Sequence, residues 1–322
     1  MDRQGNHIRL GITMILMALI LRLGSAGFFQ PVADFITGQG LYKALFFLET
    51  GRSIPDSQEV SVFFGESAPP VTAASLPVFS PQDLDSIDLT NTSGLDPDLN
   101  GLLCTPLDWD LFGQEPTVLI LHTHTTESYT KTSETYAETS AYRTLEEGYN
   151  MLSIGDLVAD KLSQQGIAVI HDRTFHDYPS YNGSYTRARE TISGYLDQYP
   201  SIRLVLDLHR DASGEGRNQM RPVTKVAGKS CAQLMLVLGT NMDTWQDNLS
   251  LALKLQAQLE KLAPGITRPL QLRPQRFNQD LCPGALLIEV GAAGNTHSEA
   301  LLAADYLAQT LIFLAKGTQE AP

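Results

Sequence analysis

The feature that most constrains the fold is an alternation of short apolar runs with segments of helical periodicity, which begins near residue 116. Each apolar run is rich in branched side chains, as expected of a buried strand. The predicted strands lie at 117–124, 167–172, 202–209, 232–240 and 284–291, and the predicted helices at 147–165, 184–199, 244–263 and 298–315. Strands that alternate with helices predict an α/β fold, in which helices flank both faces of an open, mostly parallel sheet.

The N-terminal residues have the composition of a membrane-targeting segment. Residues 10–21, "LGITMILMALIL", are almost wholly apolar, and Arg3 and Arg9 precede them. A basic region before an apolar run is typical of signal and anchor sequences, and the apolar character continues far enough to span a bilayer. The small residues of "GSAGF" also suit a signal-peptide cleavage site, which is the alternative. We expect residues 1–30 to be a retained signal-anchor of a single-pass membrane protein, and either alternative places the rest of the chain outside the cytoplasm.

Residues 31–114 have a different composition from the rest of the chain. No lysine or arginine occurs between Arg52 and Lys131, whereas acidic residues, proline, serine and threonine are frequent. Such a segment buries little apolar surface, so we expect 31–114 to be a largely disordered acidic stalk. The folded domain is then expected at 115–318.

Charge and cysteine content exclude two classes of function. The net charge is −13, and nucleic-acid binding needs a basic face, so no nucleic-acid partner is expected. The three cysteines, Cys104, Cys231 and Cys282, show no CxxC spacing, which argues against a structural zinc knot. We expect buried or inert thiols.

Polar side chains follow three of the predicted strands at the point where each strand ends. They are His122, His124 and Glu127 after the first strand, Asp207, His209, Arg210 and Asp211 at the end of the third, and Glu289 in the last. Because the carboxyl ends of parallel strands meet at one edge of a sheet, we expect these side chains to lie together.

These residue types predict a zinc site. Catalytic zinc takes three protein ligands and keeps a fourth position for water, and His124, Glu127 and His209 form such a His₂Glu set. Glu289 is then the carboxylate that moves protons without binding the metal. Arg210 is expected to hold a substrate carboxylate or to balance the acidic surroundings.

Two alternative ligand sets remain open from the residues alone. Glu146 or Glu147, at the start of the next helix, would replace the glutamate ligand in one of them. In the other, His122 joins His124 and His209, since residues two apart share a strand face. The chain lacks HExxH, which excludes a thermolysin-type helix site.

Several segments resemble one known family. They are "ILHTHTTESY", "DYPSYNGSYTRARETI", "YPSIRLVLDLHRDA", "AQLMLVLGT" and "LRPQRFNQDLCPGALLIEVGAAGNTHSEA". Over about residues 116–316 the chain is similar to the stage II sporulation protein P family. The resemblance implies a cell-wall hydrolase of endospore formers, with the fold of the zinc-dependent N-acetylmuramoyl-L-alanine amidases, so that 115–318 is a zinc amidase-like catalytic domain.

The resemblance also implies roles for individual residues. His124, His209 and Glu289 fall at the positions of two zinc ligands and the catalytic glutamate of the amidases. Those enzymes draw their glutamate ligand from just before the first helix, which points to Glu146 or, failing that, Glu147. The family's own motif points instead to Glu127, which we favour because HxxE spacing also serves zinc in carboxypeptidases.

The activity implied by the resemblance is hydrolysis of peptidoglycan, at the amide between N-acetylmuramic acid and L-alanine, with additional cleavage within the stem peptide. The resemblance implies the stage II sporulation proteins D and M as partners during engulfment, and the N-terminal segment predicts contact with the membrane. The alternatives are a zinc carboxypeptidase or endopeptidase acting on stem peptides only, or a non-enzymatic wall-binding module.

Overall fold

The computed structural model describes residues 61–63, 76–107, 109–133, 136–212, 214–215 and 218–316. The predicted membrane segment at 1–30 lies outside these residues, as does most of the predicted stalk up to residue 75. All of the described residues belong to one structural unit, Ser57–Pro322.

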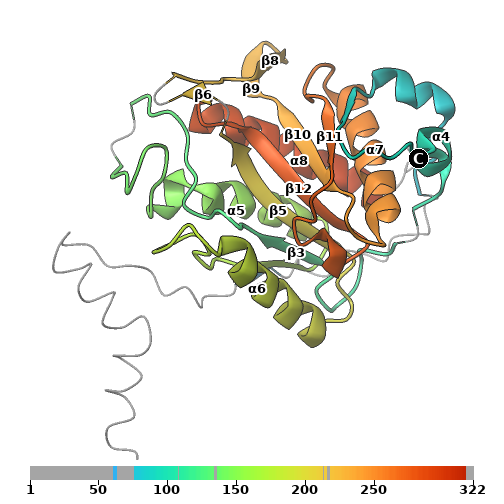
Figure 1. The fold of residues 1–322 in the computed structure, drawn as a ribbon, viewed down its shortest axis with the longest axis horizontal. Coiled ribbons are helices and arrows are strands. Elements are labelled where there is room, and N and C mark those ends of the chain that lie inside the picture. The colour runs from blue at the N-terminus through green and yellow to red at the C-terminus, as the bar shows by residue number, and fades with distance from the viewer. Residues whose placement is uncertain are drawn as a thin grey trace, which may run out of the picture. The chain divides into compact units, whose positions relative to one another are not determined.

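Eight strands form a single sheet (Figure 1). In sheet order they are β1 (Ser61–Phe63), β4 (Val169–His171), β3 (Val118–Leu121), β5 (Leu204–Asp211), β12 (Ala285–Ala292), β10 (Leu234–Gly239), β11 (Leu270–Arg273) and β2 (Leu89–Asn91). All neighbouring pairs are parallel except β1–β4 and β10–β12. The predicted mostly parallel α/β sheet is therefore confirmed.

Helices cover both faces of this sheet. One face packs against α5 (Met151–Ser163), α7 (Trp245–Leu262) and α8 (His297–Lys316), and the other packs against α6 (Ser184–Gln198). Side chains of a strand alternate between faces, so Val118 and Ile120 lie in the larger core while Leu119 and Leu121 contact the α6 side. Figure 1 shows α6 on one side of the strands and α5 and α8 on the other.

The predicted helices differ from the observed ones only at their ends. The helix expected at 147–165 begins at Met151, because the side chain of Asn150 accepts a hydrogen bond from the Leu152 amide at 3.0 Å and caps it. The preceding residues Glu147–Tyr149 form a separate 3₁₀ turn, η2. Glu146 and Glu147 thus precede α5 rather than belong to it.

Part of the expected stalk is folded. Residues 76–107 contain the 3₁₀ helix η1 (Pro81–Ser86), β2 and the short helix α4 (Leu99–Cys104). The edge strand β2 pairs with β11, Leu103 is fully buried, and Lys254 of α7 donates to the Leu102 carbonyl at 2.7 Å. The disorder prediction rested on the average composition of 31–114, which is acidic, although the segment contains a few apolar residues, such as Leu103, that pack against the domain.

Several short elements had no counterpart among the predicted ones. These are the hairpins β6 (Gly214–Glu215) with β7 (Asn218–Gln219) and β8 (Val223–Val226) with β9 (Lys229–Ala232), the strand β11, and the 3₁₀ turn η3 (Gln279–Leu281).

All three cysteines are free thiols, and burial raises the pKa of Cys231 to about 12.

Helix α8 is long and apolar enough to cross a membrane by length and composition alone. In the described part of the chain, however, 56% of its apolar stretch is buried in the core. Its apolar sequence is explained by packing against α5 and α7.

Candidate metal centre

The centre of the candidate site lies on two adjacent parallel strands. Glu289 of β12 and His209 of β5 are register partners. In β5, Val205 packs in the α6-side core, so the alternation of side chains also places Asp207 and His209 on that face. The backbone register therefore brings a carboxyl group and an imidazole together at the carboxyl end of the sheet.

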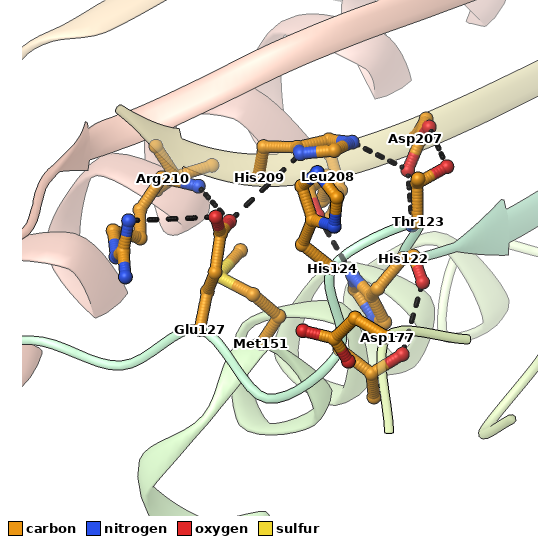
Figure 2. A network of polar contacts seen from close by, with 12 residues as sticks. His122, Thr123, His124, Glu127, Met151, Asp177, Asp207, Leu208, His209 and Arg210 are labelled. Atoms are coloured by element: carbon orange, nitrogen blue, oxygen red, sulfur yellow. Dashed lines mark hydrogen bonds and ion pairs between the residues drawn. The ribbon is translucent and has the colours of Figure 1, made fainter. Parts of the chain in front are cut away.

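A turn after β3 supplies the remaining side chains. The strand ends at Leu121, and Thr123 then donates from its amide and hydroxyl to Asp207, at 2.8 and 2.6 Å. Thr126 donates in the same way to Asp177, at 3.1 and 2.6 Å. These paired bonds fix the turn against β5 and the 172–177 loop, and Figure 2 shows the contact between Thr123 and Asp207.

The fixed turn brings His124 and Glu127 to His209 (Figure 2). The rings of His124 and His209 are perpendicular, with centroids 5.2 Å apart, and Glu127 Oε2 lies 3.8 Å from His209 Nδ1. The exposed fractions of His124, Glu127 and His209 are only 7%, 3% and 3%. The three predicted ligands are thus buried neighbours.

Unsatisfied polar atoms concentrate in this site. Buried polar atoms nearly always have hydrogen-bond partners, and only six in the described residues lack one. Three of the six are His124 Nδ1, His209 Nε2 and Glu289 Oε2. His209 Nε2 does lie 2.9 Å from Asp207 Oδ1, an ion-pair distance, but without hydrogen-bond geometry. Such atoms fit a site that takes a further ligand.

The side chains of the site are not arranged as a complete set of metal ligands. Among the described residues, no group of three or more His, Cys, Asp or Glu side chains is arranged so that it could hold a metal ion. The Glu127 carboxylate instead accepts from the Arg210 amide at 3.1 Å and from Arg143 Nη2 at 3.3 Å. Ligand binding by Glu127 would have to compete with these contacts.

Electrostatics separate the roles of the acidic and imidazole groups. Burial raises the pKa of Glu289 to about 8, and the nearby His209 offsets this only in part. Burial would lower the pKa of His209, but Asp207 outweighs it and raises that pKa to about 9. Burial lowers the pKa of His124 to about 4, which keeps this ring neutral and able to bind a metal. A carboxyl group that titrates near neutrality is suited to proton transfer.

His122 lies on the opposite side of the turn. Its Nδ1 is 3.0 Å from the Leu208 carbonyl, and its Nε2 is 2.9 Å from His171 Nε2. A Cβ on Gly155 of α5 would lie 2.7 Å from His122 Nε2, so the His122 ring is packed directly on the helix. Both ring nitrogens are occupied by protein, which does not favour the three-histidine ligand set.

The two other candidate glutamates have partners of their own. Glu146 accepts a hydrogen bond from the Ala137 amide at 2.9 Å, and Glu147 forms an ion pair with Arg173 at 2.6 Å. The structure places neither in contact with His124 or His209 through any hydrogen bond or ion pair that it describes for them. Glu127 is the candidate glutamate that lies beside His209.

Arg210 does not point toward Glu289. It follows His209 in β5, so its side chain projects from the opposite face. Its guanidinium is buried and donates to the carbonyls of Ser128 at 3.0 Å and Tyr142 at 2.9 Å, and also to Glu127. These contacts favour the charge-balancing role over a substrate clamp.

Two further site residues had no predicted role. Asp207 pairs with both Thr123 and His209, and Tyr181 stacks on His124 with ring centroids 4.6 Å apart. Asp207 was visible as a polar residue at a strand end, two positions before His209. Tyr181 lies in a loop, where residue type gives no indication of the final position.

The fold and the site define an α/β protein with a buried His, Glu and Asp cluster at the carboxyl edge of a mostly parallel sheet. The model of the family Stage II sporulation protein P matches residues 76–312, and the chain belongs to that family. It is 28% identical over 206 residues to Stage II sporulation protein P of Bacillus subtilis (strain 168), covering 60% of this chain and 49% of that protein. The match thus spans about half the length of the relative.

Solved structures with a similar arrangement include two enzymes. One is the N-acetylmuramoyl-L-alanine amidase from Clostridium difficile 630, with 19% identity over 63% of this chain and 95% of that chain, at a TM-score of 0.38. The other is the N-acetylmuramoyl-L-alanine amidase AmiC2 of Nostoc punctiforme, with 13% identity over 63% and 97% of the two chains, at a TM-score of 0.38.

Proposed function

We propose that this protein is a zinc-dependent N-acetylmuramoyl-L-alanine amidase that hydrolyses peptidoglycan during sporulation. The bond cleaved is the amide between the lactyl group of N-acetylmuramic acid and L-alanine, and cleavage within the stem peptide is a second activity. The observation that carries the proposal is the group of unpartnered buried atoms on His124, His209 and Glu289. Membership of the family supports the biological setting.

His124, Glu127 and His209 are the residues proposed to hold zinc. The Nε2 atom of His124 is 3.2 Å from the Tyr181 hydroxyl, which leaves its unpartnered Nδ1 for the metal. The unpartnered ring nitrogen of His209 is Nε2, which lies 2.9 Å from Asp207 Oδ1. Ligand histidines commonly use their second nitrogen in this way, which fixes the ring and raises its basicity. When bound, zinc supplies a Lewis acid that polarises the substrate carbonyl and activates water.

Glu289 is proposed to move the proton. Its unpartnered Oε2 accepts a proton from the attacking water, and the same oxygen delivers it to the leaving nitrogen of L-alanine. The products are a free lactyl carboxylate and a peptide with a new amino terminus. A pKa raised to about 8 by burial makes Glu289 both a competent base and a competent acid near neutral pH.

The cellular setting is proposed from the N-terminus and from the family. Residues 1–30 would anchor the chain in the cell membrane, with the catalytic domain on the outer side, and the stage II sporulation proteins D and M would be its partners. Support for the orientation comes from Arg3 and Arg9, which precede the apolar run.

Product analysis tests the proposal against its alternatives. Purified sacculi treated with the zinc-loaded protein should release peptides that begin with L-alanine. Release of single amino acids or of peptides cut internally, with no free L-alanine terminus, would instead indicate a carboxypeptidase or an endopeptidase. Binding to sacculi without any product would indicate a wall-binding module. The buried Arg210, already committed to three protein oxygens, argues against a carboxypeptidase, which needs a clamp for a terminal carboxylate.

A further inference from the structure

We propose that Tyr181 contacts the substrate, donating a hydrogen bond from its phenolic hydroxyl to a substrate carbonyl oxygen. We further infer that Arg187 is a positioning residue that holds Tyr181 in place. This inference rests on the proposed amidase function, because it concerns the same site. It adds a substrate-binding residue that the ligand and proton-transfer roles do not include.

The position of Tyr181 is unusual for an aromatic residue. It is 54% exposed, although large aromatic rings are usually buried. Its ring stacks on the buried His124 ring at an interplanar angle of 19°, and its hydroxyl lies 3.2 Å from His124 Nε2. The residue therefore spans from solvent to a proposed zinc ligand.

The direction of this hydrogen bond follows from the chemistry of the ring. If Nδ1 of His124 binds zinc, the single ring hydrogen sits on Nε2. Nε2 then donates to the Tyr181 oxygen, so the phenolic hydrogen is not used in that bond. That hydrogen is available to an acceptor that approaches the exposed side of Tyr181, and a substrate carbonyl oxygen is such an acceptor.

The loop that carries Tyr181 is held from one point on α6. The guanidinium of Arg187 donates to the carbonyls of His176 at 2.6 Å, Ser180 at 2.5 Å and Asn182 at 3.2 Å. These carbonyls lie on both sides of Tyr181 in the chain. Three bonds from one planar group fix the loop in a way that a flexible lysine cannot reproduce.

A second cation fixes the tyrosine ring itself. Arg143 Cζ lies 5.0 Å from the centroid of the Tyr181 ring, within the range of a cation–π contact. Arg143 is in turn bound to Asp177 and Glu127. Tyr181 is thus ordered before substrate arrives, which reduces the entropic cost of binding.

Removal of the single hydroxyl is the direct test. The probe is N-acetylmuramoyl-L-alanyl-D-isoglutamine, whose binding is measured by calorimetry at saturating zinc in a Glu289→Gln background, so that no turnover occurs. Adding Tyr181→Phe should weaken binding about fivefold or more, the effect of one hydrogen bond. In the active protein it should lower kcat/KM on sacculi by about tenfold or more.

Tyr199→Phe is the matched control. Tyr199 lies at the other end of α6, and its hydroxyl accepts from the Gln198 side chain at 3.0 Å. This variant should bind the probe as the parent protein does. Equal binding and equal kcat/KM for Tyr181→Phe and Tyr199→Phe would overturn the role of Tyr181, while wild-type cleavage of sacculi would leave the amidase proposal intact.

The positioning role is tested by a double-mutant cycle. Arg187→Lys should weaken probe binding, and the double variant with Tyr181→Phe should be no weaker than Tyr181→Phe alone within about twofold. If the double variant instead loses probe affinity by the product of the two single-variant losses, Arg187 does not act through Tyr181. A wild-type protein that releases no product overturns the proposed function, and failure of the Glu289→Gln parent to bind the probe overturns the Tyr181 contact as well.

Discussion

Glu289 of β12 and His209 of β5 are register partners on adjacent parallel strands, and their side chains project from the face that carries α6. The pairing puts an unpartnered carboxyl oxygen beside a candidate zinc ligand. The distance between these groups is set by the sheet backbone, which is rigid, rather than by a loop. Separate roles for the two side chains can therefore be tested by single substitutions.

Glu289→Gln should separate proton transfer from metal binding. The amide keeps the shape of the side chain but cannot accept the water proton, so we expect about one zinc per chain and a loss of turnover on the order of 100-fold. Zinc is measured by elemental analysis and turnover on sacculi. The exposed Glu190 of α6 provides a control, since Glu190→Gln should leave both unchanged. Turnover above a tenth of the wild-type value in Glu289→Gln would remove it from the mechanism.

Glu127→Gln should weaken zinc binding. Loss of a charged ligand is expected to lower zinc affinity at least tenfold, and added zinc should restore part of the activity. Glu146→Gln is the comparison, because Glu146 accepts from the Ala137 amide and is expected to affect zinc little. The reverse result, with Glu146→Gln losing the metal, would identify the glutamate before α5 as the ligand.

His209→Ala and His122→Asn should have different effects. His209→Ala removes a proposed ligand and should abolish both zinc retention and hydrolysis. His122→Asn should keep about one zinc per chain but lower the free energy of unfolding by about 1–3 kcal/mol, because partners of the buried ring lose their hydrogen bonds. Thermal unfolding and metal analysis of the same samples distinguish the two. Loss of zinc in His122→Asn would favour the alternative in which His122, His124 and His209 are the ligands.

Much of the site could be predicted because its residues end apolar strands. A buried strand that finishes in His or Glu places that group at the edge of the sheet, and the structure brings His124, Glu127, His209 and Glu289 together there. Arg210 was expected to hold a substrate carboxylate or to balance the acidic surroundings, and its contacts with three protein oxygens favour the second role. Its side chain leaves β5 on the face opposite to His209, because neighbours in a strand point to opposite faces. Strand alternation therefore limits what adjacency in sequence can indicate.

The features that the sequence did not predict depend on contacts between residues far apart in the chain. Tyr181 stacks on His124 from a loop whose carbonyls accept hydrogen bonds from Arg187, and its ring faces Arg143. The segment 76–107 folds because β2 adds to the sheet at β11, a pairing between residues about 180 positions apart in the chain. Average composition and local periodicity do not contain such pairings.

The orientation of the chain in the membrane is tested on intact protoplasts. Arg3 and Arg9 precede the apolar run, so the N-terminus should stay in the cytoplasm and the catalytic domain should face outward. A protease added outside should then digest the domain, detected by an antibody to its C-terminal part. A cytoplasmic protein in the same sample should stay intact until the protoplasts are lysed. Protection of the domain before lysis would contradict this topology.

Glu299 should make stability fall in acid. Burial alone would raise its pKa, but the ion pair with Arg221 and hydrogen bonds from Ser230, Thr296 and Asn295 lower it to about 2. Because the folded pKa lies below the ordinary value of 4.5, this stabilisation is complete above pH 4.5 and is lost as pH falls toward 2.

The contribution of Glu299 is isolated by comparing wild type with Glu299→Gln in urea unfolding at several pH values. The variant should be less stable at pH 7 by about 1–2 kcal/mol, since charge-assisted hydrogen bonds become neutral ones. The difference between the two proteins should shrink between pH 4.5 and 2, because the wild-type carboxylate becomes protonated over that range. Glu190→Gln controls for removal of a negative charge from an exposed helical position. A difference that is constant across this pH range would show that the carboxylate of Glu299 does not stabilise the start of α8 through its charge.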